Sequence, residues 1–439
     1  MKKMTLVVLI LCLFSLPSEA TVLTLEECIA QAVERNPALH QARARYEAAL
    51  AQSKVVRTQR WPSFKAQLSY FRLSDVDPFS VETPLGMITI AEPILDVYQG
   101  SLSVQQPVFT GFRLVHNIEM AQKNAQISRL QVDTEQWDLQ FEVIKAYYRV
   151  INSRSTRKFI AESIKTMQAH VTDVRNFREA GVATTNDVLQ SEVLLSNLQI
   201  QLNRAENAVA LADLLLNTLL NRADFAAVEI DEQLTISPTP TIALETLLGL
   251  AFQQRLELRQ LDAQRDVTQH IVAIARSDYY PTVLAAGVYS YAQPNSRYQP
   301  PEEEFNGDWS IGLTMSITPF DWGKTRQRIQ QAQAQQREIE ARTEQVRLLI
   351  RSEVTQTYLQ KQEAERRLEL VRTTVTQAQE NLKVAHDQYK EGMNRNTDVL
   401  DAEILVLQAN LDQTQAEIDY LITSALLRKA VGSEPVENR

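Results

Sequence analysis

The sequence predicts a mainly α-helical chain that carries a membrane β-barrel part and is internally duplicated. Three observations support this prediction. Two very long segments contain neither glycine nor proline, shorter segments alternate apolar with polar residues, and this order of segments occurs twice along the 439-residue chain. The first observation predicts helices, the second strands and the third two repeats. The expected fold therefore has long antiparallel coiled-coil helical hairpins plus four strands per chain.

One of the two very long predicted helices runs from Lys324 to Glu391, a segment rich in Gln, Glu, Arg, Ala and Leu. At about 1.5 Å per residue it spans roughly 100 Å, more than an ordinary globular domain needs. Gly392 fits the left-handed position that ends many helices. Thr397 or Asp398 can cap the N-terminus of the helix that follows. Its apolar seam is Leu400, Ile404, Leu407, Leu411, Thr414, Ile418, Leu421 and Ala425. The two helices must fold back on each other to cover their seams.

The first 20 residues have the layout of a secretory signal peptide. Two lysines precede an apolar run that ends at Leu16, and small residues finish the segment at Ala20. The apolar run is too short to span a bilayer, which argues against a membrane anchor. We expect an exported chain whose remaining thiol is Cys28, so an intramolecular disulfide is ruled out. The net charge of −9 argues against nucleic acid as a partner.

A helix precedes the strands of each repeat. In the first repeat it is capped at Thr24 and ends at Trp61-Pro62, and in the second it starts near Leu244 and ends at Tyr280-Pro281. Between the repeats, the pattern predicts a connector with a short strand around Val228 and Ile230.

Each repeat then carries two strands joined by a loop. The clearest strand alternates apolar residues with Ser, Gly and Thr: Trp309, Ile311, Leu313, Met315 and Ile317. Its length suits a tilted membrane-spanning strand with one face toward lipid. The other strands run from Phe64 to Tyr70, through Leu102 and Val104, and from Val283 to Tyr291, and a loop rich in Asp, Pro and Ser separates the first two. A hairpin packed on a soluble core is the competing interpretation, but the flanking helices are too long and polar to supply that core.

Four strands cannot close a barrel, and open strand edges cannot lie in lipid. The chain must therefore share its barrel with other copies of itself. Bacterial barrels begin at about eight strands, so two copies are arithmetically sufficient and three copies give a barrel of about twelve strands.

The two halves match at a nearly constant offset. Gly181 ends the first long helix 211 residues before Gly392 ends the second, and Pro107 precedes Pro319 by 212 residues. The helical seams repeat as well, with Ile160, Ile164, Met167, Val171 and Val174 matching Val371, Val375, Ala378, Leu382 and Ala385.

These matches predict five segments. Residues 1–20 form the signal peptide, 21–220 the first repeat, 221–241 the connector, 242–432 the second repeat and 433–439 a C-terminal tail.

At this point the chain resembles the TolC family of outer-membrane efflux and secretion channels over its whole mature length. The features that carry the resemblance are the duplicated units, the matching segments Pro107–Gly111 and Pro319–Gly323, and the paired turns at Gly181–Leu189 and Gly392–Leu400. The resemblance implies a homotrimer with a twelve-stranded barrel in outer-membrane lipid and a periplasmic α-helical tunnel. It also implies a periplasmic adaptor and an inner-membrane pump of the RND or ABC type as partners.

The resemblance further implies a gate at the periplasmic entrance of the tunnel. Acidic residues after the second turn ring this entrance in the family, and the matching positions here are Asp398 and Asp401. Their i, i+3 spacing puts both carboxylates on one helix face. In the first repeat Gln190 replaces the second acid. The alternative for Asp398 is that it only caps its helix.

Tyr389 and Asp187 match positions that latch the closed entrance in the family. Arg395 is expected to supply the cation of this latch, although it stands one residue later than in the family pattern. The turns at Gly181 and Gly392 are expected to dock onto the adaptor, because they lie farthest from the barrel.

Three other classes of protein explain the sequence less well. The five histidines show no ligand spacing, so we expect neither an enzyme nor a cofactor or metal site. A periplasmic adaptor would show one helical hairpin without paired strands. A secreted coiled-coil structural protein would leave the strands unexplained. The expected function is an exit duct that passes substrates from an inner-membrane pump through a gated helical tunnel.

Overall fold

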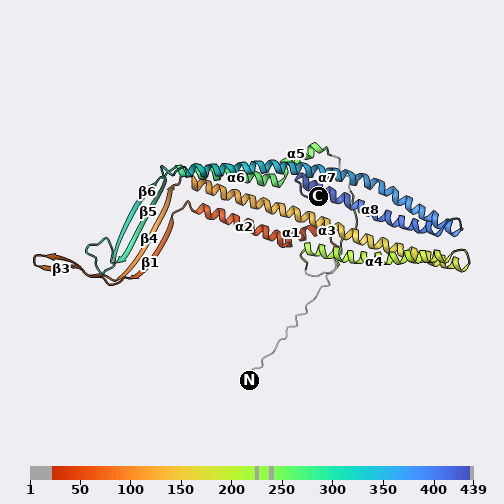
Figure 1. Ribbon diagram of the computed structural model, residues 1–439, viewed down its shortest axis with the longest axis horizontal. Coiled ribbons are helices and arrows are strands. Elements are labelled where there is room, and N and C mark those ends of the chain that lie inside the picture. The colour runs from red at the N-terminus through yellow and green to blue at the C-terminus, as the bar shows by residue number, and fades with distance from the viewer. Residues whose placement is uncertain (1–21, 223–226, 237–241, 436–439) are drawn as a thin grey trace, which may run out of the picture. The chain divides into compact units, whose positions relative to one another are not determined.

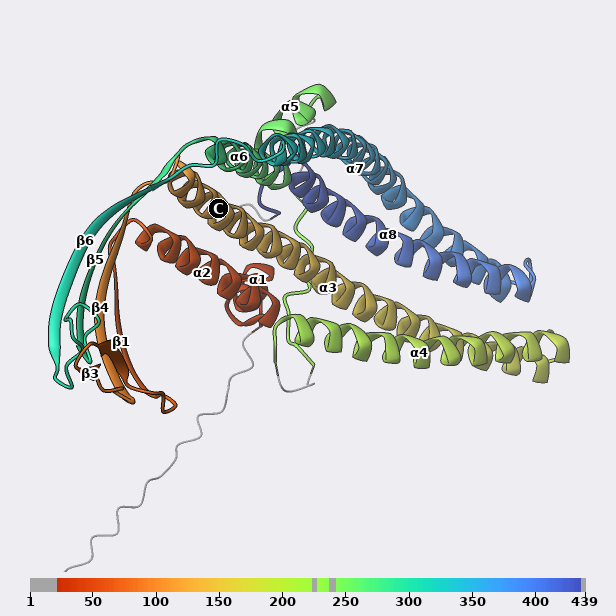
Figure 2. The same ribbon diagram turned by 60° about the vertical axis from the view of Figure 1, so that its left-hand side comes forward.

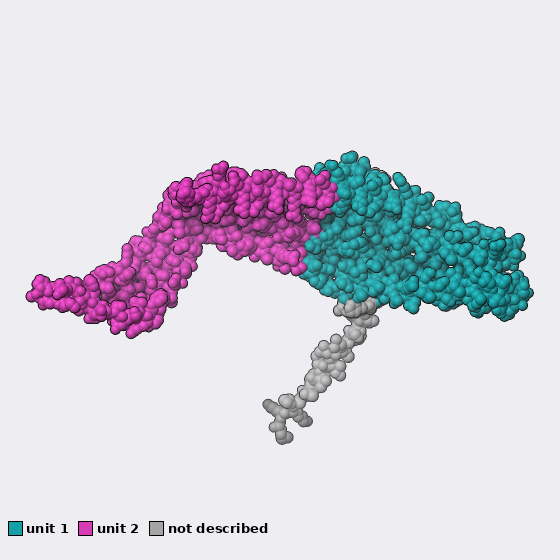
Figure 3. All heavy atoms as spheres, viewed as in Figure 1, with its two compact units in different colours: residues 1–40, 135–253, 350–439 teal, residues 41–134, 254–349 magenta. Residues whose placement is uncertain are grey.

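The computed structural model describes residues 22–222, 227–236 and 242–435 (Figure 1). The expected signal peptide lies outside these residues, as do parts of the expected connector and tail. The chain divides into two compact units (Figure 3). Unit 1 contains residues 1–40, 135–253 and 350–439, and unit 2 contains residues 41–134 and 254–349.

Unit 2 contains an antiparallel four-stranded sheet in the order β1-β4-β5-β6. The strands are β1 (Ser63–Arg72), β4 (Asp96–Phe109), β5 (Thr282–Gln293) and β6 (Asn306–Ser316). Each repeat supplies one hairpin, and the pairing of β4 with β5 joins the two repeats into one sheet. Strands β1 and β6 are left as the two edges of the sheet.

The register gives this sheet one apolar and one polar face. Directly opposed residues point to the same side of a sheet. One row across the four strands is Ala66, Leu102, Tyr289 and Trp309. The next row is Gln67, Ser101, Ser290 and Asp308. On the apolar face the side chain of Ile311 is 80% exposed. The predicted alternation is confirmed in β6, whereas in β5 Leu284 and Val288 lie in the rows of the polar face. The apolar face is bare among the described residues.

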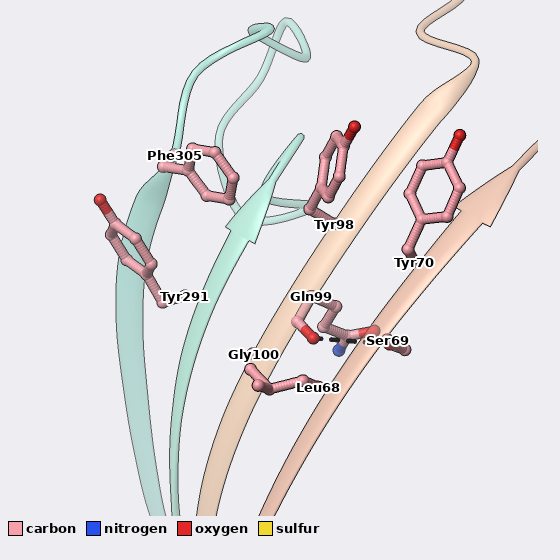
Figure 4. A pocket seen from close by; sticks show the side chains of 8 residues that line it. All are labelled: Leu68, Ser69, Tyr70, Tyr98, Gln99, Gly100, Tyr291 and Phe305. Atoms are coloured by element: carbon pink, nitrogen blue, oxygen red, sulfur yellow. Dashed lines mark hydrogen bonds between the residues drawn. The ribbon is translucent and has the colours of Figure 1, made fainter.

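Aromatic side chains mark both ends of the apolar face. At the loop end, Tyr70, Tyr98, Tyr291 and Phe305 surround a hollow of about 490 Å³ (Figure 4). The rings of Tyr291 and Phe305 stack with centroids 5.4 Å apart. At the helix end, Phe64 of β1 lies on the same face as Ala66 and is 72% exposed.

The strand-to-helix segments turn sharply at left-handed residues. Gly111 has φ +61° and Gly323 has φ +80°. A Cβ atom on Gly111 would lie 2.8 Å from both the Ser277 carbonyl oxygen and the Tyr280 Cβ atom, so only glycine fits there. These two turns lie at the ends of the matching segments Pro107–Gly111 and Pro319–Gly323.

The segment predicted as a loop between the first two strands also contains regular secondary structure. It contains a second, two-stranded sheet of β2 (Phe79–Thr83) and β3 (Gly86–Ala91). Thr83 closes the turn by donating its hydroxyl to the Gly86 carbonyl oxygen at 2.7 Å. The sequence analysis missed this hairpin because the flanking Asp, Pro and Ser residues dominate the composition of the segment.

The helices form the rest of both units. They are α1 (Leu25–Arg35), α2 (Pro37–Thr58), α3 (Arg113–Glu179), α4 (Thr185–Leu219), α5 (Leu244–Gln254), α6 (Leu256–Arg276), the short η1 (Ser277–Tyr279), α7 (Lys324–Lys390) and α8 (Asn396–Val431). Figure 2 shows the expected hairpins, α3 with α4 and α7 with α8. The predicted Thr24 cap is confirmed, since its hydroxyl accepts the Glu27 N–H at 3.3 Å. Among the described residues, no helix combines the length and the apolar character that crossing a bilayer requires.

Two details of the helical prediction are wrong. The helix expected from Leu244 is broken at Arg255 into α5 and α6. The expected short strand of the connector is reduced to a single bridge between Leu23 and Ile230. Arg154 on α3 fixes the connector instead, since its guanidinium bonds the Val228 carbonyl oxygen at 2.6 Å and pairs with buried Asp213 at 3.0 Å.

Within unit 1, the matching seams of α3 and α7 differ in burial. The α3 seam residues Ile160, Met167 and Val171 are buried, and they pack with residues of α4 and α8. On α7 the matching residues Val371 and Leu382 are only half-buried. The same spacing therefore leaves the second seam partly uncovered in a single chain.

We predict that Ile311→Arg lowers the yield of folded protein from membranes, because an arginine on the lipid face of a barrel costs about 2–4 kcal/mol near the bilayer midplane. Thr314→Arg is the matched control, since Thr314 lies on the polar face of the same strand. The measurement is the yield of folded protein that each variant gives in lipid vesicles. Equal losses in the two would contradict the assignment of the apolar face to lipid.

Candidate gate at the paired helical turns

The two helical turns of unit 1 have the same backbone geometry. Gly181 has φ +78° and Gly392 has φ +73°, which confirms the predicted left-handed positions. In each turn the next N–H reaches back five residues: Val182 donates to the Phe177 carbonyl oxygen and Met393 to that of Gln388, both at 2.8 Å. This pattern satisfies the last carbonyl groups of a helix. No atom lies within 4 Å of a Cβ built on either glycine, so both turns are open.

An acidic residue caps the helix that follows each turn. The Thr184 N–H donates to Asp187 Oδ2 at 2.8 Å, and the Arg395 N–H donates to Asp398 Oδ2 at 3.1 Å. Helix α8 starts at Asn396 with Arg395 in the N-cap position, so neither Thr397 nor Asp398 is the N-cap residue. Asp398 nevertheless caps the helix, from its third position, and Asp187 does the same in the first repeat.

A buried polar cluster joins the starts of the two capped helices. His170 Nε2 lies 2.8 Å from Asn396 Oδ1, and Asn396 Nδ2 donates to the Asp187 carbonyl oxygen at 3.1 Å and to Ser191 Oγ at 3.2 Å. His170, Ser191 and Asn396 are all buried. Burial lowers the pKa of His170, so its neutral form donates from Nε2 to the amide oxygen. The sequence analysis missed this cluster, because nothing in the spacing relates His170 to Asn396.

The structure brings the three expected latch residues to one cavity. Tyr389, Asp187 and Arg395 line a space of about 350 Å³ together with Gln190. Within the described residues they are not bonded to one another: the Asp187 carboxylate is engaged by Thr184, the buried Tyr389 hydroxyl has no hydrogen-bond partner, and Arg395 has no ion pair. Burial, and secondarily the charges of Asp187 and Asp173, raise the pKa of Tyr389.

The two expected gate acids are both exposed on α8. Asp398 is engaged in its cap, whereas Asp401 has no hydrogen-bond or ion-pair partner among the residues described. The adjacent Ala402 is buried. Asp401 is therefore a free carboxylate at the edge of a packed helix face, one turn inside the helix.

The same helix carries a buried acid that the sequence analysis missed. Glu403 is 5% exposed, and its Oε1 atom has no partner among the described residues. Burial raises its pKa to about 7. The seam was expected to pass through Ile404, but Ile404 is 49% exposed and Glu403 takes the buried position instead. The residue types favoured Ile404, so this exchange could not be predicted from hydrophobic periodicity.

Comparisons with known proteins agree with this architecture. The profile of the outer membrane efflux protein family matches residues 28–222 and 247–433. The outer membrane protein TolC of Vibrio cholerae is 22% identical over 99% of this chain and 96% of its own length. The alkaline protease secretion protein AprF of Pseudomonas aeruginosa is 23% identical over 77% of this chain and 70% of its own. The crystal structure of the outer membrane protein VceC from Vibrio cholerae superposes with a TM-score of 0.78 at 18% identity, covering 94% of this chain and 97% of that one.

We predict that Glu403→Gln stabilises the protein more at pH 8 than at pH 5. The folded-state pKa of Glu403 lies above its ordinary value of 4.5, so the folded chain holds this proton more tightly than the unfolded chain. The contribution of protonated Glu403 to the free energy of unfolding is fully present below pH 4.5. It is lost as the pH rises through 7, a loss of about 3 kcal/mol per chain. The measurement is the difference in unfolding temperature between variant and wild type at each pH.

Glu391→Gln is the matched control, because Glu391 is an exposed glutamate beside the turn. A Glu403→Gln difference that does not grow with pH would show that the carboxyl is ionised in the folded protein.

Proposed function

The chain belongs to the outer membrane efflux protein family, and from this premise we propose that it forms the exit duct of a tripartite efflux or type I secretion system. It is a protein of the bacterial outer membrane. The duct passes substrates from an inner-membrane pump to the exterior through a gated helical tunnel in the periplasm.

The observation that carries this proposal is the bare, apolar face of the four-stranded sheet, bounded by aromatic side chains at both ends. A periplasmic adaptor or a secreted coiled-coil protein has no need of such a face. Strands β1 and β6 each leave one row of backbone groups unpaired, which lipid does not tolerate. We assign closure to a homotrimer, in which β1 of one chain pairs with β6 of the next and the barrel has about twelve strands.

The half-buried seam of α7 supports the same assembly. Val371 and Leu382 keep the seam spacing but are only half-buried by their own chain. In a closed ring of helical hairpins, a neighbouring subunit would cover them. The two family matches, at residues 28–222 and 247–433, support the division into two repeats of residues 21–220 and 242–432.

A periplasmic adaptor and a pump of the RND or ABC type are the proposed partners. AprF is by its name a protein of alkaline protease secretion, which supports a secretion role beside an efflux role. The turns at Gly181 and Gly392 are the proposed docking surfaces, because both are exposed, open and built alike.

The proposed gate is the ring of Asp398 and Asp401. In a trimer these residues give six carboxylates around one opening, which attract cations. The cap at Asp398 fixes that carboxylate to the Arg395 N–H, whereas Asp401 is free to bind an ion. Asp187, Tyr389 and Arg395 are the proposed latch, since they line one cavity beside this ring.

We predict a cation-selective channel in planar bilayers that multivalent cations block from the periplasmic side. Asp401→Ala relieves the block without changing folding, because the side chain is exposed and unbonded within the described chain. Asp398→Ala relieves it partly and destabilises α8 by about 1 kcal/mol, since the cap is lost. Conductance and half-blocking concentration are the measurements.

Glu369→Ala controls for loss of an exposed acid elsewhere on the hairpin, because Glu369 lies on α7 about 35 Å before the turn. An unchanged block in the Asp398, Asp401 double variant would place the ring on other residues.

We predict that Gly392→Asn reduces transport while the yield of trimer stays normal. Asparagine tolerates the left-handed backbone better than other residues and has open space here, so the fold is kept while the docking surface gains a side chain. Gly249→Asn is the matched control, because Gly249 also has open space around it but lies on α5. Transport in a deletion strain and the mass of the extracted protein are measured together. Loss of the trimer would make the role of this glycine structural and remove the support for docking.

A further inference from the structure

Two histidines and a glutamate converge in unit 2. His116 and Glu119 lie one turn apart on α3, and His270 faces them from α6. His116 Nδ1 lies 3.2 Å from His270 Nδ1. Glu119 Oε2 lies 3.4 Å from His116 Nδ1 and 3.3 Å from His270 Nδ1. The three atoms therefore form a nearly equilateral triangle.

The size of this triangle fits a transition-metal ion. Zn²⁺ binds imidazole nitrogen and carboxylate oxygen at about 2.0–2.2 Å, usually with four ligands in a tetrahedron. Two ligands about 2.1 Å from the ion at a tetrahedral angle are about 3.4 Å apart. The three measured separations lie close to this value. An ion seated above the triangle would be bonded to all three atoms without movement of the backbone.

The donor atoms also select the kind of ion. Imidazole nitrogen suits Zn²⁺, Ni²⁺ and Cu²⁺, whereas Ca²⁺ and Mg²⁺ prefer oxygen ligands. Two imidazoles and one carboxylate leave a fourth position for water. The side chains of His116, Glu119 and His270 are 29%, 45% and 20% exposed, so an ion can reach them from solvent.

The site lies within a ladder of polar contacts between the same two helices. On one side of it, Arg113 of α3 bonds Ser277, which directly follows α6, at 3.0 Å. On the other side, Lys123 pairs with Asp266 at 2.8 Å. Helix α3 follows strand β4 and α6 precedes strand β5, and these two strands are hydrogen-bonded partners. A link between the helices therefore fixes the segments that lead into the central pair of strands.

We propose that His116, Glu119 and His270 form a binding site for one divalent transition-metal ion of the Zn²⁺ type, which fastens α3 to α6 beside the sheet. The site is independent of the gate and of the cargo. The sequence analysis missed it because His270 is far from His116 along the chain, and the i, i+3 spacing of His116 and Glu119 is by itself a weak signal.

The test is a Zn²⁺ titration of the full chain, purified without a polyhistidine tag and treated with a chelator. The expected result is one Zn²⁺ per chain, with binding weakened at least about tenfold in His270→Gln and in Glu119→Gln. At the same Zn²⁺ concentration, the unfolding temperature of the wild type rises more than that of either variant. His386→Gln is the matched control, because His386 also lies beside another histidine, with its ring centroid 5.8 Å from that of His170; it retains full binding.

A spectroscopic readout keeps the test decisive if the variants fold poorly. Co²⁺ added to the wild type gives the intense visible bands of a four-coordinate nitrogen and oxygen site at one ion per chain, and Zn²⁺ displaces it. Equal Zn²⁺ affinity in wild type, His270→Gln and Glu119→Gln would overturn the proposal. So would a Co²⁺ spectrum of the hexaaqua ion, or a loss of binding in His386→Gln alone.

Discussion

The unpaired backbone edges of the sheet are the constraint on which the rest of the molecule depends. Strands β1 and β6 each present a row of N–H and C=O groups that a bilayer cannot satisfy. The apolar face between them is equally unsuited to water, because side chains such as Ile311 and Trp309 are exposed on it. Pairing between chains would remove the first problem and lipid removes the second. The proposed oligomerisation and the outer-membrane location both follow from one sheet that has too few strands to close.

The duplicated plan repeats backbone geometry more strictly than side-chain chemistry. Both turns have a left-handed glycine, and in both an acid at the third helical position caps the following helix. The side chains one turn later differ, since Gln190 stands where the second repeat has Asp401. Caps and turns are required to end and start helices in either repeat, so they persist. In the proposed gate, the second acid is supplied by the second repeat alone, as Asp401.

The parts of this fold that were predictable are those set by local chemistry. Glycine ended the helices at Gly181 and Gly392, and alternation fixed the two faces of β6. The parts that were not predictable depend on which distant residues meet. Glu403 is buried and Ile404 is exposed, the reverse of what their polarity predicts. The buried cluster around Asn396 and the triad at His116 each join residues more than 150 positions apart. Nothing in a single sequence records such meetings. Composition also misled at the β2–β3 hairpin, where polar flanking residues concealed two short strands.

The buried cluster at Asn396 limits how the proposed gate can move. Its amide bonds His170 on α3 and both Ser191 and the Asp187 carbonyl oxygen on α4, so the start of α8 is tied to the first hairpin. Pulling α8 away alone would leave these buried groups unpaired, at a cost of about 1–3 kcal/mol for each. Movement of α8 together with the first hairpin, α3 and α4, avoids that cost. If α8 moves alone, these contacts break and water has to enter to replace the lost partners. The cluster therefore favours a coupled movement of the first hairpin and α8, which carries the proposed gate residues Asp398 and Asp401.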